Sequence, residues 1–478
     1  MRNRKINGFI GVACMSLSLA ACSLPTQINK DPEKNIPGAY SLGNADTSTT
    51  AAIKWKDFFT DQYLVDLVDT ALQNNQELNI TWQEIQIARN EVRARKGEYL
   101  PFVNFQGGAG VDKAARYTSK GSSEATTEIA PGKETPDPLQ DYMFGLYANW
   151  EVDIWKKLRN AKKAAASRYL ATIEGKNFVV TNLVAEVANS YYELLALDNQ
   201  LAIVRRNIDI QNDAFEIVKL QKQAARVTEL AVRRFEAQVL NTRSLQYAIQ
   251  QRITETENRI NFLLGRYPQH IKRSTATFVE MQPALVAAGI PSQLLENRPD
   301  VRQAEKDLVA AKLDVKVARA KFYPSLGISA GVGYRAFDPS YLIKSPESLL
   351  YSLAGDLAAP LINRNAIKAA YYTANSKQIQ AVYNYERTLI NAYVEVANQL
   401  ANINNLEQSY SLKSKQVQAL SESVDIANNL FKSARADYME VLLTQRDALE
   451  AKFELVETRR QQMNAMVNVY HALGGGWK

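Results

Sequence analysis

The stretch Ser325-Leu326-Gly327-Ile328-Ser329-Ala330-Gly331-Val332-Gly333-Tyr334 decides the fold class. Its even positions are apolar and its odd positions are serine or glycine, and a period of two is typical of a β-strand. The predicted strand therefore has one apolar face and one face of very small residues.

Three further stretches alternate in the same way, clearly at 142–152 and more weakly at 103–111 and 349–357. The sequence thus predicts two β-hairpins, at about residues 102–152 and 325–358. Each strand is about ten residues long, the length that crosses a bilayer when the strand is tilted.

Alternation alone fits a small soluble sandwich equally well. The rest of the chain offers no second sheet to cover the apolar face, so a lipid environment is the favoured cover. Four strands cannot close a barrel, because single-chain barrels begin at about eight, and an open sheet edge is not tolerated in hydrocarbon. Several copies of the chain are therefore expected to share one membrane β-barrel.

Long helices occupy most of the remaining sequence. None of the fifteen prolines falls within 139–267 or 361–478, and Gly175 is the single glycine between residues 156 and 264. Proline and glycine are the residues that destabilise helix interiors most. A continuous helix over 156–224 would be about 100 Å long at 1.5 Å per residue.

The two halves of the chain are an internal repeat. A coiled-coil-like apolar seam in the first half, interrupted by Gln211, returns 209 residues later, where Lys413 interrupts it. Earlier in each half the spacing is 223, which places Val92 against Val315 and Pro101 against Pro324. The two spacings differ by 14 residues, and the first half accommodates these extra residues in a polar stretch at 112–140.

These patterns predict a mainly α-helical fold with a membrane β-barrel portion and an internal two-fold repeat. The first repeat is expected at 53–275, with a long helix pair at about 156–264. The second is expected at 276–478, with a helix at about 298–322 and a long helix pair at about 364–473.

The N-terminus carries Arg2, Arg4 and Lys5 before an apolar stretch at 8–21 that is too short to span a bilayer as a helix. This pattern predicts a signal peptide at 1–21. The segment ends Leu19-Ala20-Ala21-Cys22, which resembles a bacterial lipobox and makes Cys22 the expected lipidation site; the alternative is ordinary cleavage beside an incidental cysteine. Residues 22–52, with several prolines and glycines, are expected to form a lipidated flexible tether.

Composition argues against several classes of function. The chain has two cysteines and two histidines, so a thiolate metal site, a disulfide or histidine-based catalysis has few residues to draw on. The net charge of +7 is spread along the chain, which argues against nucleic-acid binding. No glycine-rich phosphate loop occurs. We therefore expect no catalytic, cofactor-binding or metal site, and no enzyme.

The sequence resembles the TolC-like outer-membrane efflux proteins, in the lipoprotein branch that serves resistance-nodulation-division (RND) pumps. The matching stretches are 55–59 with 71–75, Asn297-Arg298-Pro299-Asp300 with the residues up to Glu305, 322–326, and Ala472-Leu473-Gly474-Gly475-Gly476-Trp477. The resemblance implies a homotrimer with a shared twelve-stranded barrel in the outer membrane and a helical tunnel in the periplasm. It also implies a passive exit duct for drugs or other toxic small molecules, with a periplasmic adaptor and an inner-membrane RND pump as partners.

The resemblance further places the adaptor contacts at the two helix-to-helix turns, where the candidate residues are Arg226, Val227, Thr228, Arg435, Ala436 and Asp437. Family members usually carry glycine where Ala225 and Ala434 stand. An acidic constriction near the second turn matches Glu440, whereas a second acid found in some members falls on Leu443. Glu440 has an equally weighted alternative role, because Asp437 and Glu440 have the spacing of a helix-capping box.

Two other functions remain open from the sequence. A duct for type I protein secretion or for metal ions is possible within the same class, although the seven methionines form no metal-binding string. A periplasm-spanning coiled-coil lipoprotein without a pore is the alternative from another class, and the strand alternation argues against it.

Overall fold

A computed structural model describes residues 30–33, 36–40, 48–274, 278–284, 286–433 and 435–478. The chain forms two compact units. Of the described residues, unit 1 contains 30–31 and those of 86–170 and 306–383, and unit 2 contains those of 32–85, 171–305 and 384–478. Each unit thus takes segments from both sequence repeats.

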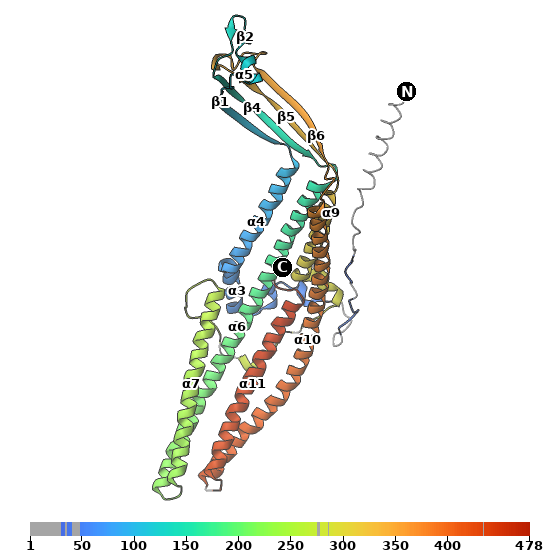
Figure 1. Cartoon of the computed structure of the whole chain (residues 1–478). Helices are drawn as coiled ribbons and strands as arrows, with labels where there is room; N and C mark the ends of the chain where they lie inside the picture. The colour runs from blue at the N-terminus through green and yellow to red at the C-terminus, as the bar shows by residue number, and fades with distance from the viewer. Residues whose placement is uncertain (1–29, 34–35, 41–47, 275–277, 285, 434) are drawn as a thin grey trace. The chain divides into compact units, whose positions relative to one another are not determined.

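The sheet of unit 1 has four long strands in the order β1-β4-β5-β6, all antiparallel. They are β1 (Phe102–Asp112), β4 (Leu139–Val152), β5 (Ser325–Ala336) and β6 (Leu349–Ala358). The alternating stretches are therefore strands, and β4 pairs with β5 to join the two predicted hairpins (Figure 1).

One face of this sheet is strongly apolar and uncovered in the single chain. Phe105 is 70% exposed and both Tyr351 and Leu353 are 79% exposed. The central strands approach closely at Gly145 and Gly333, where a Cβ on Gly145 would lie 2.7 Å from the Val332 carbonyl oxygen. Glycine at this pair is required by the spacing of the strands.

The polar connection between β1 and β4 contains more structure than its sequence pattern predicts. It holds the short helix α5 (Ser119–Glu124) and the two-stranded pair β2 (Glu128–Ala130) and β3 (Lys133–Glu134). The Lys133 ammonium lies 3.3 Å from the Tyr341 hydroxyl, which follows β5.

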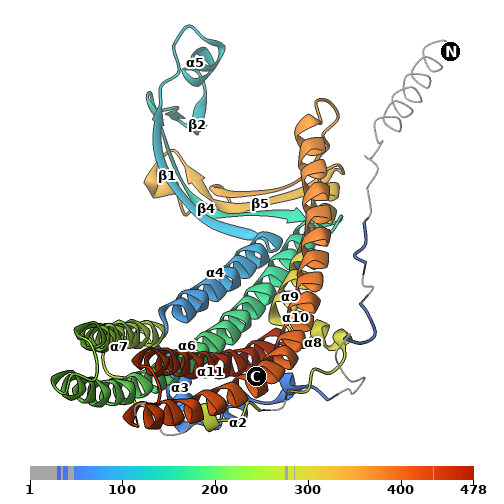
Figure 2. The ribbon, with the colours of Figure 1, turned by 90° about the horizontal axis from the view of Figure 1, so that it is seen from below.

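The major helices are long, as the proline-free runs predict. They are α4 (Gln76–Tyr99), α6 (Lys157–Gln223), α7 (Glu229–Leu263), α9 (Pro299–Ala320), α10 (Asn365–Lys432) and α11 (Tyr438–Ala472). Shorter elements are η1 (Thr50–Ala52), α2 (Trp55–Phe58), α3 (Gln62–Asn74), η2 (Phe278–Glu280), η3 (Pro291–Gln293), α8 (Leu294–Asn297) and η4 (Pro339–Tyr341). In Figure 1 the helices α7, α6, α11 and α10 follow one another in that order, and Figure 2 shows the same four helices from below.

An extensive apolar core belongs to unit 2 and joins distant parts of the chain. The Tyr470 ring stacks on Phe58 with centroids 4.1 Å apart, and its hydroxyl donates to the Ile53 carbonyl at 2.7 Å. Tyr191, fully buried in the same cluster, donates to Asp61 at 2.6 Å.

The described residues of the predicted tether at 22–52 belong to both units, and in each unit they pack against other residues. In unit 2, Tyr40 is 4% exposed and stacks on Tyr393, and Thr49 forms a β-bridge with Ala288. In unit 1, the Lys30 carbonyl accepts a hydrogen bond from Gln378 at 3.1 Å. Cys22 and the predicted signal peptide lie outside the described residues.

Within the described residues, no helix is both long and apolar enough to cross a membrane.

Candidate functional site at the helix tips

The turn between α6 and α7 closes α6 with a Schellman-type pair of hydrogen bonds. The Arg226 amide donates to the Gln221 carbonyl and the Ala225 amide to the Lys222 carbonyl, both at 2.9 Å. Ala225 has a φ of 55°, in the left-handed region, where a residue with a Cβ costs about 1–2 kcal/mol more than glycine. The alanine noted in the sequence therefore stands at a position that favours glycine.

The turn between α10 and α11 carries the same long-range bond. The Arg435 amide donates to the Leu430 carbonyl at 2.8 Å, five residues back along the chain. Ala434 itself lies outside the described residues. The two turns thus close their helices in a similar way, as the internal repeat leads one to expect.

A small apolar core holds the two tips together. Phe235 of α7 is fully buried against Val218 of α6, Phe431 of α10 and Val441 of α11. Burial of such side chains is worth about 1.5–3 kcal/mol each. The tips are therefore a packed four-helix end, with both turns fixed beside each other.

A cavity of about 300 Å³ lies between the turns and brings together five of the six predicted adaptor-contact residues, while Arg435 does not line it. Its lining is of mixed polarity, with apolar, cationic and acidic side chains: Gln221, Arg226, Val227, Thr228, Phe431, Lys432, Ala436, Asp437 and Tyr438.

An ion-pair network stiffens the first tip. Glu229, in the first turn of α7, pairs with Lys222 across the turn and with Arg233 at 2.8 Å, and Arg233 also pairs with Glu236 at 2.8 Å. The hydrogen bond from Lys222 holds the pKa of Glu229 below its ordinary value. The network is exposed, so its contribution to stability is small.

Glu440 lies in the first turn of α11 with an exposed side chain. Asp437 is the N-cap residue of α11, but its side chain makes no capping hydrogen bond; the Glu440 amide donates to the Asp437 backbone carbonyl at 3.1 Å. The reciprocal side-chain bonds of a capping box are thus absent at this helix start, within the part of the chain that is described.

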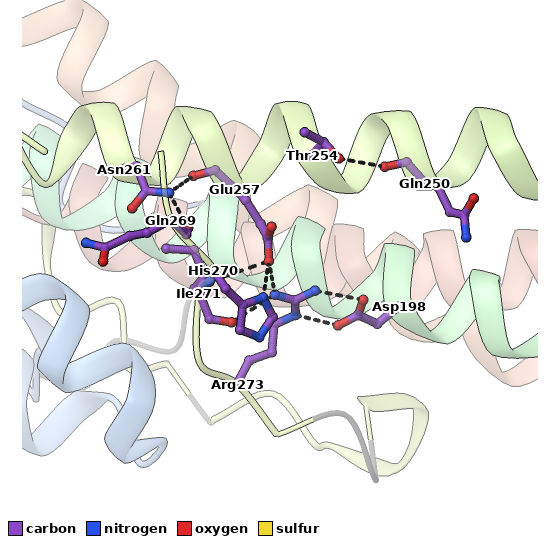
Figure 3. Close-up of polar contacts among 9 residues, drawn as sticks. All are labelled: Asp198, Gln250, Thr254, Glu257, Asn261, Gln269, His270, Ile271 and Arg273. Carbon is purple, nitrogen blue, oxygen red and sulfur yellow. Dashed lines mark hydrogen bonds and ion pairs between the residues drawn. The ribbon is translucent and has the colours of Figure 1, made fainter. Parts of the chain in front are cut away.

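Two buried ion-pair clusters of unit 2 were not predicted. In the first, Arg273 is hydrogen bonded to Asp198 of α6 at 2.5 and 3.0 Å and pairs with Glu257 of α7, so that the segment after α7 is fixed to both helices (Figure 3). His270 lies 3.0 Å from Glu257 through its Nδ1 atom. The partners of Arg273 are far away in the sequence or lie on another element, so no local pattern points to them.

The second cluster gives a role to Asn297-Arg298-Pro299-Asp300. Arg298 is 4% exposed and pairs with Asp300 and Glu395, each at 2.7 Å, while donating to the Ala472 carbonyl at 2.8 Å. Trp477 donates to the Asn297 carbonyl at 3.1 Å. Two of the stretches that carry the family resemblance therefore meet in space.

A comparison with protein-family models supplies the decisive observation. The model described as outer membrane efflux protein matches residues 67–266 and 290–475, which is most of the chain. The chain belongs to the outer membrane efflux protein family.

Individual relatives align with this chain over nearly their whole lengths. The cation efflux system protein CusC of Escherichia coli strain K12 is 28% identical over 469 residues, which is 97% of this chain and 98% of CusC. The pyoverdine export outer membrane protein OpmQ of Pseudomonas aeruginosa is 27% identical over 465 residues, covering 97% and 95% of the two chains. A crystal structure of CusC superposes with a TM-score of 0.83 at 26% identity, over 95% of this chain and all of that one.

The predicted fold class and function are confirmed by these comparisons. This member of the outer membrane efflux protein family has the fold of the TolC-like channels, with a β-barrel portion and a helical tunnel, and is an efflux channel of the outer membrane. Its family consists of transport proteins.

Proposed function

We propose that the protein works as a homotrimer, in which three copies of the four-stranded sheet close one barrel. The observation that carries the proposal is the sheet order, because β1 and β6 are edge strands without an outer neighbour in the described chain. Unpaired strand edges are not tolerated in hydrocarbon, and three four-stranded sheets supply a closed barrel.

The tip cavity is the proposed docking site for a periplasmic adaptor, which in turn links the duct to an inner-membrane RND pump. Both turns line one cavity of mixed polarity, which suits recognition of another protein's helical or loop surface. The protein itself would then be a passive duct that catalyses no reaction. Among the described residues, no group of three or more histidine, cysteine, aspartate or glutamate side chains is arranged to hold a metal ion.

Small molecules are the proposed cargo class, with the choice of cargo assigned to the inner-membrane pump. CusC is named for cations and OpmQ for pyoverdine, yet this chain is almost equally identical to both. Sequence identity to these outer-membrane relatives therefore does not show which cargo this protein transports. A type I secretion or metal-ion duct is the alternative cargo within the same proposal.

Planar-bilayer recording of the purified protein, together with native mass spectrometry, tests the proposal. A homotrimer that requires detergent and produces discrete conductance steps is the expected result. A stable water-soluble monomer, or a trimer that conducts neither as the wild type nor as Glu440→Ala, would contradict the duct.

A gate at Glu440 is the second part of the proposal. If Glu440 of each copy faces a closed aperture, three carboxylates attract cations there, so Glu440→Ala should reduce cation selectivity in bilayer recordings. Asp437→Ala is the matched control, because it removes a carboxylate of the same turn whose side chain makes no capping hydrogen bond, and it should leave both helix stability and ion selectivity almost unchanged.

Equal cation selectivity in the wild type and Glu440→Ala would remove the gate assignment. The exit-duct proposal would survive that outcome, since it depends on the strands and the family and not on Glu440.

A further inference from the structure

A cationic cavity lies in unit 1 between α9, α10 and the segment Lys30-Asp31. It has a volume of about 290 Å³, and its lining includes the cations Lys30, Lys312, Lys316 and Arg319 against the single carboxylate Asp31. Such an excess of positive charge around a cavity attracts an anion.

Its acidic neighbours are already occupied by other cations. Asp31 pairs with Lys312 at 2.8 Å, and Asp314, on the same helix, pairs with Arg168. Among the described residues no ion pair involves Lys316 or Arg319, and both are exposed. These two cations lie one turn apart on α9 and so are free to bind one anionic group.

An aromatic pair lies near the end of α9, next to the strands. The Trp155 ring stacks on Tyr323 with centroids 4.6 Å apart and donates to the Pro324 carbonyl at 2.7 Å, directly before β5 begins at Ser325. Tryptophan and tyrosine prefer the boundary between hydrocarbon and water. Arg319 lies in the last turn of α9, which ends at Ala320, and Tyr323 follows three residues after that end. The cationic end of the cavity is therefore close in sequence to residues that prefer the headgroup region.

The repeat provides independent support. At a spacing of 223 residues, Lys312, Lys316 and Arg319 correspond to Arg89, Arg93 and Lys96 on α4. All three of these side chains are basic, and α4 leads into β1 as α9 leads into β5. A favourable interaction with the helix dipole accounts only for cations in the last turn, so the two earlier cations in each set require another explanation.

We propose that the cavity of Lys30, Lys312, Lys316 and Arg319 binds the phosphate of an anionic phospholipid in the periplasm-facing leaflet of the outer membrane. Lys316 and Arg319 would bind the phosphate directly, and Lys312 would remain paired with Asp31. The proposal uses the outer-membrane location and depends neither on trimer formation nor on the gate.

Native mass spectrometry of the full-length protein tests this assignment. The protein is released from mixed micelles that contain equal amounts of dioleoylphosphatidylglycerol and dioleoylphosphatidylethanolamine, and the retained lipids are counted. We expect the wild type to retain mainly phosphatidylglycerol. Because a cation near an anionic lipid surface contributes about 1 kcal/mol, Lys316→Gln with Arg319→Gln should lower this preference by about tenfold or more.

Arg205→Gln with Arg206→Gln is the matched control, because it removes the same charge from exposed positions of α6 far along the chain from the strands. Its lipid preference should equal that of the wild type. Should the double variant misfold, as judged by circular dichroism, Lys316→Gln alone is measured, with an expected loss of about fivefold.

Three outcomes would overturn the proposal. The first is equal retention of both lipids by the wild type, and the second is an unchanged preference in the folded α9 variants. The third is complete displacement of phosphatidylglycerol when inorganic phosphate is added to the micelles. The last outcome would assign the cavity to a soluble phosphate instead of a lipid.

Discussion

At the scale of single residues, the carboxylate of Glu395 shows how one side chain can make the fold sensitive to acid. Burial alone would raise its pKa, but hydrogen bonding and charge from His471 and Arg298 outweigh burial and lower the pKa to about 2, from an ordinary value of 4.5. A carboxylate with a lowered pKa stabilises the fold fully above about pH 4.5, and this stabilisation is lost as the pH falls towards 2.

We therefore predict that Glu395→Gln removes part of the acid sensitivity of unfolding. At neutral pH the variant should be less stable than the wild type, by about 1 kcal/mol because the carboxylate is partly exposed. Between pH 4.5 and 2 the difference should shrink, since the wild type loses its ionised carboxylate and the variant has none. Thermal unfolding across this range measures the difference, and parallel curves for the two proteins would contradict the prediction.

The sequence singled out the Asn297-Arg298-Pro299-Asp300 stretch without predicting this cluster. Arg298 finds Glu395 and the Ala472 carbonyl at separations of 97 and 174 residues. Periodicity reports on neighbours within a few residues, so contacts of this range could not be inferred from the pattern of a single chain.

At the scale of elements, the apolar seam of the long helix α6 contains a polar residue, Gln211, that destabilises it. Gln211 is 1% exposed, and neither its amide oxygen nor its amide nitrogen has a hydrogen-bond partner among the described residues. A buried polar group without a partner costs about 1–3 kcal/mol. The repeat carries Leu420 at the equivalent position, 209 residues later.

Gln211→Leu is therefore expected to stabilise α6 locally by about 1–3 kcal/mol. Hydrogen exchange of the amides around residue 211 should slow accordingly, because their local opening becomes less favourable. The reciprocal change Leu420→Gln is the control and should speed exchange in α10. Faster exchange in Gln211→Leu would show that the amide has a stabilising partner.

Helices and strands could be predicted where the sequence has a clear alternation of apolar residues or a long run without proline. The alternation at 325–334 predicted β5, and the proline-free runs predicted the long helices. The elements α5, β2 and β3 were missed, because each is short and polar and depends on contacts such as that between Lys133 and Tyr341. The chemistry of the turn at Ala225 was noticed only through the family pattern, since alanine gives no local sign of a left-handed backbone.

At the scale of the whole molecule, anchoring in the membrane should depend more on the barrel than on lipid. We predict that mass spectrometry of the mature N-terminus finds Cys22 acylated. In Cys22→Ala, part of the protein should still reach the outer membrane and still require detergent, because each acyl chain contributes only about 0.8 kcal/mol per buried methylene. An unmodified Cys22 in the mature wild type, or cleavage at another residue, would overturn the lipidation prediction.

The composition of the two compact units also bears on how the protein matures. Unit 2 combines segments from the beginning, the middle and the end of the chain, and its core places Tyr470 against Phe58. Contacts between residues so distant in sequence form slowly, because a large loop must close before they give any stabilisation.

During synthesis and export, Phe58 and Phe59 therefore emerge long before the tyrosine that covers them. For most of that time the apolar surface of the early segment has no native partner, and surfaces of this kind aggregate readily. We therefore expect the nascent chain to need a periplasmic chaperone until its last helix arrives. A premature stop only a few dozen codons from the end is expected to yield a product for proteolysis instead of a shortened channel.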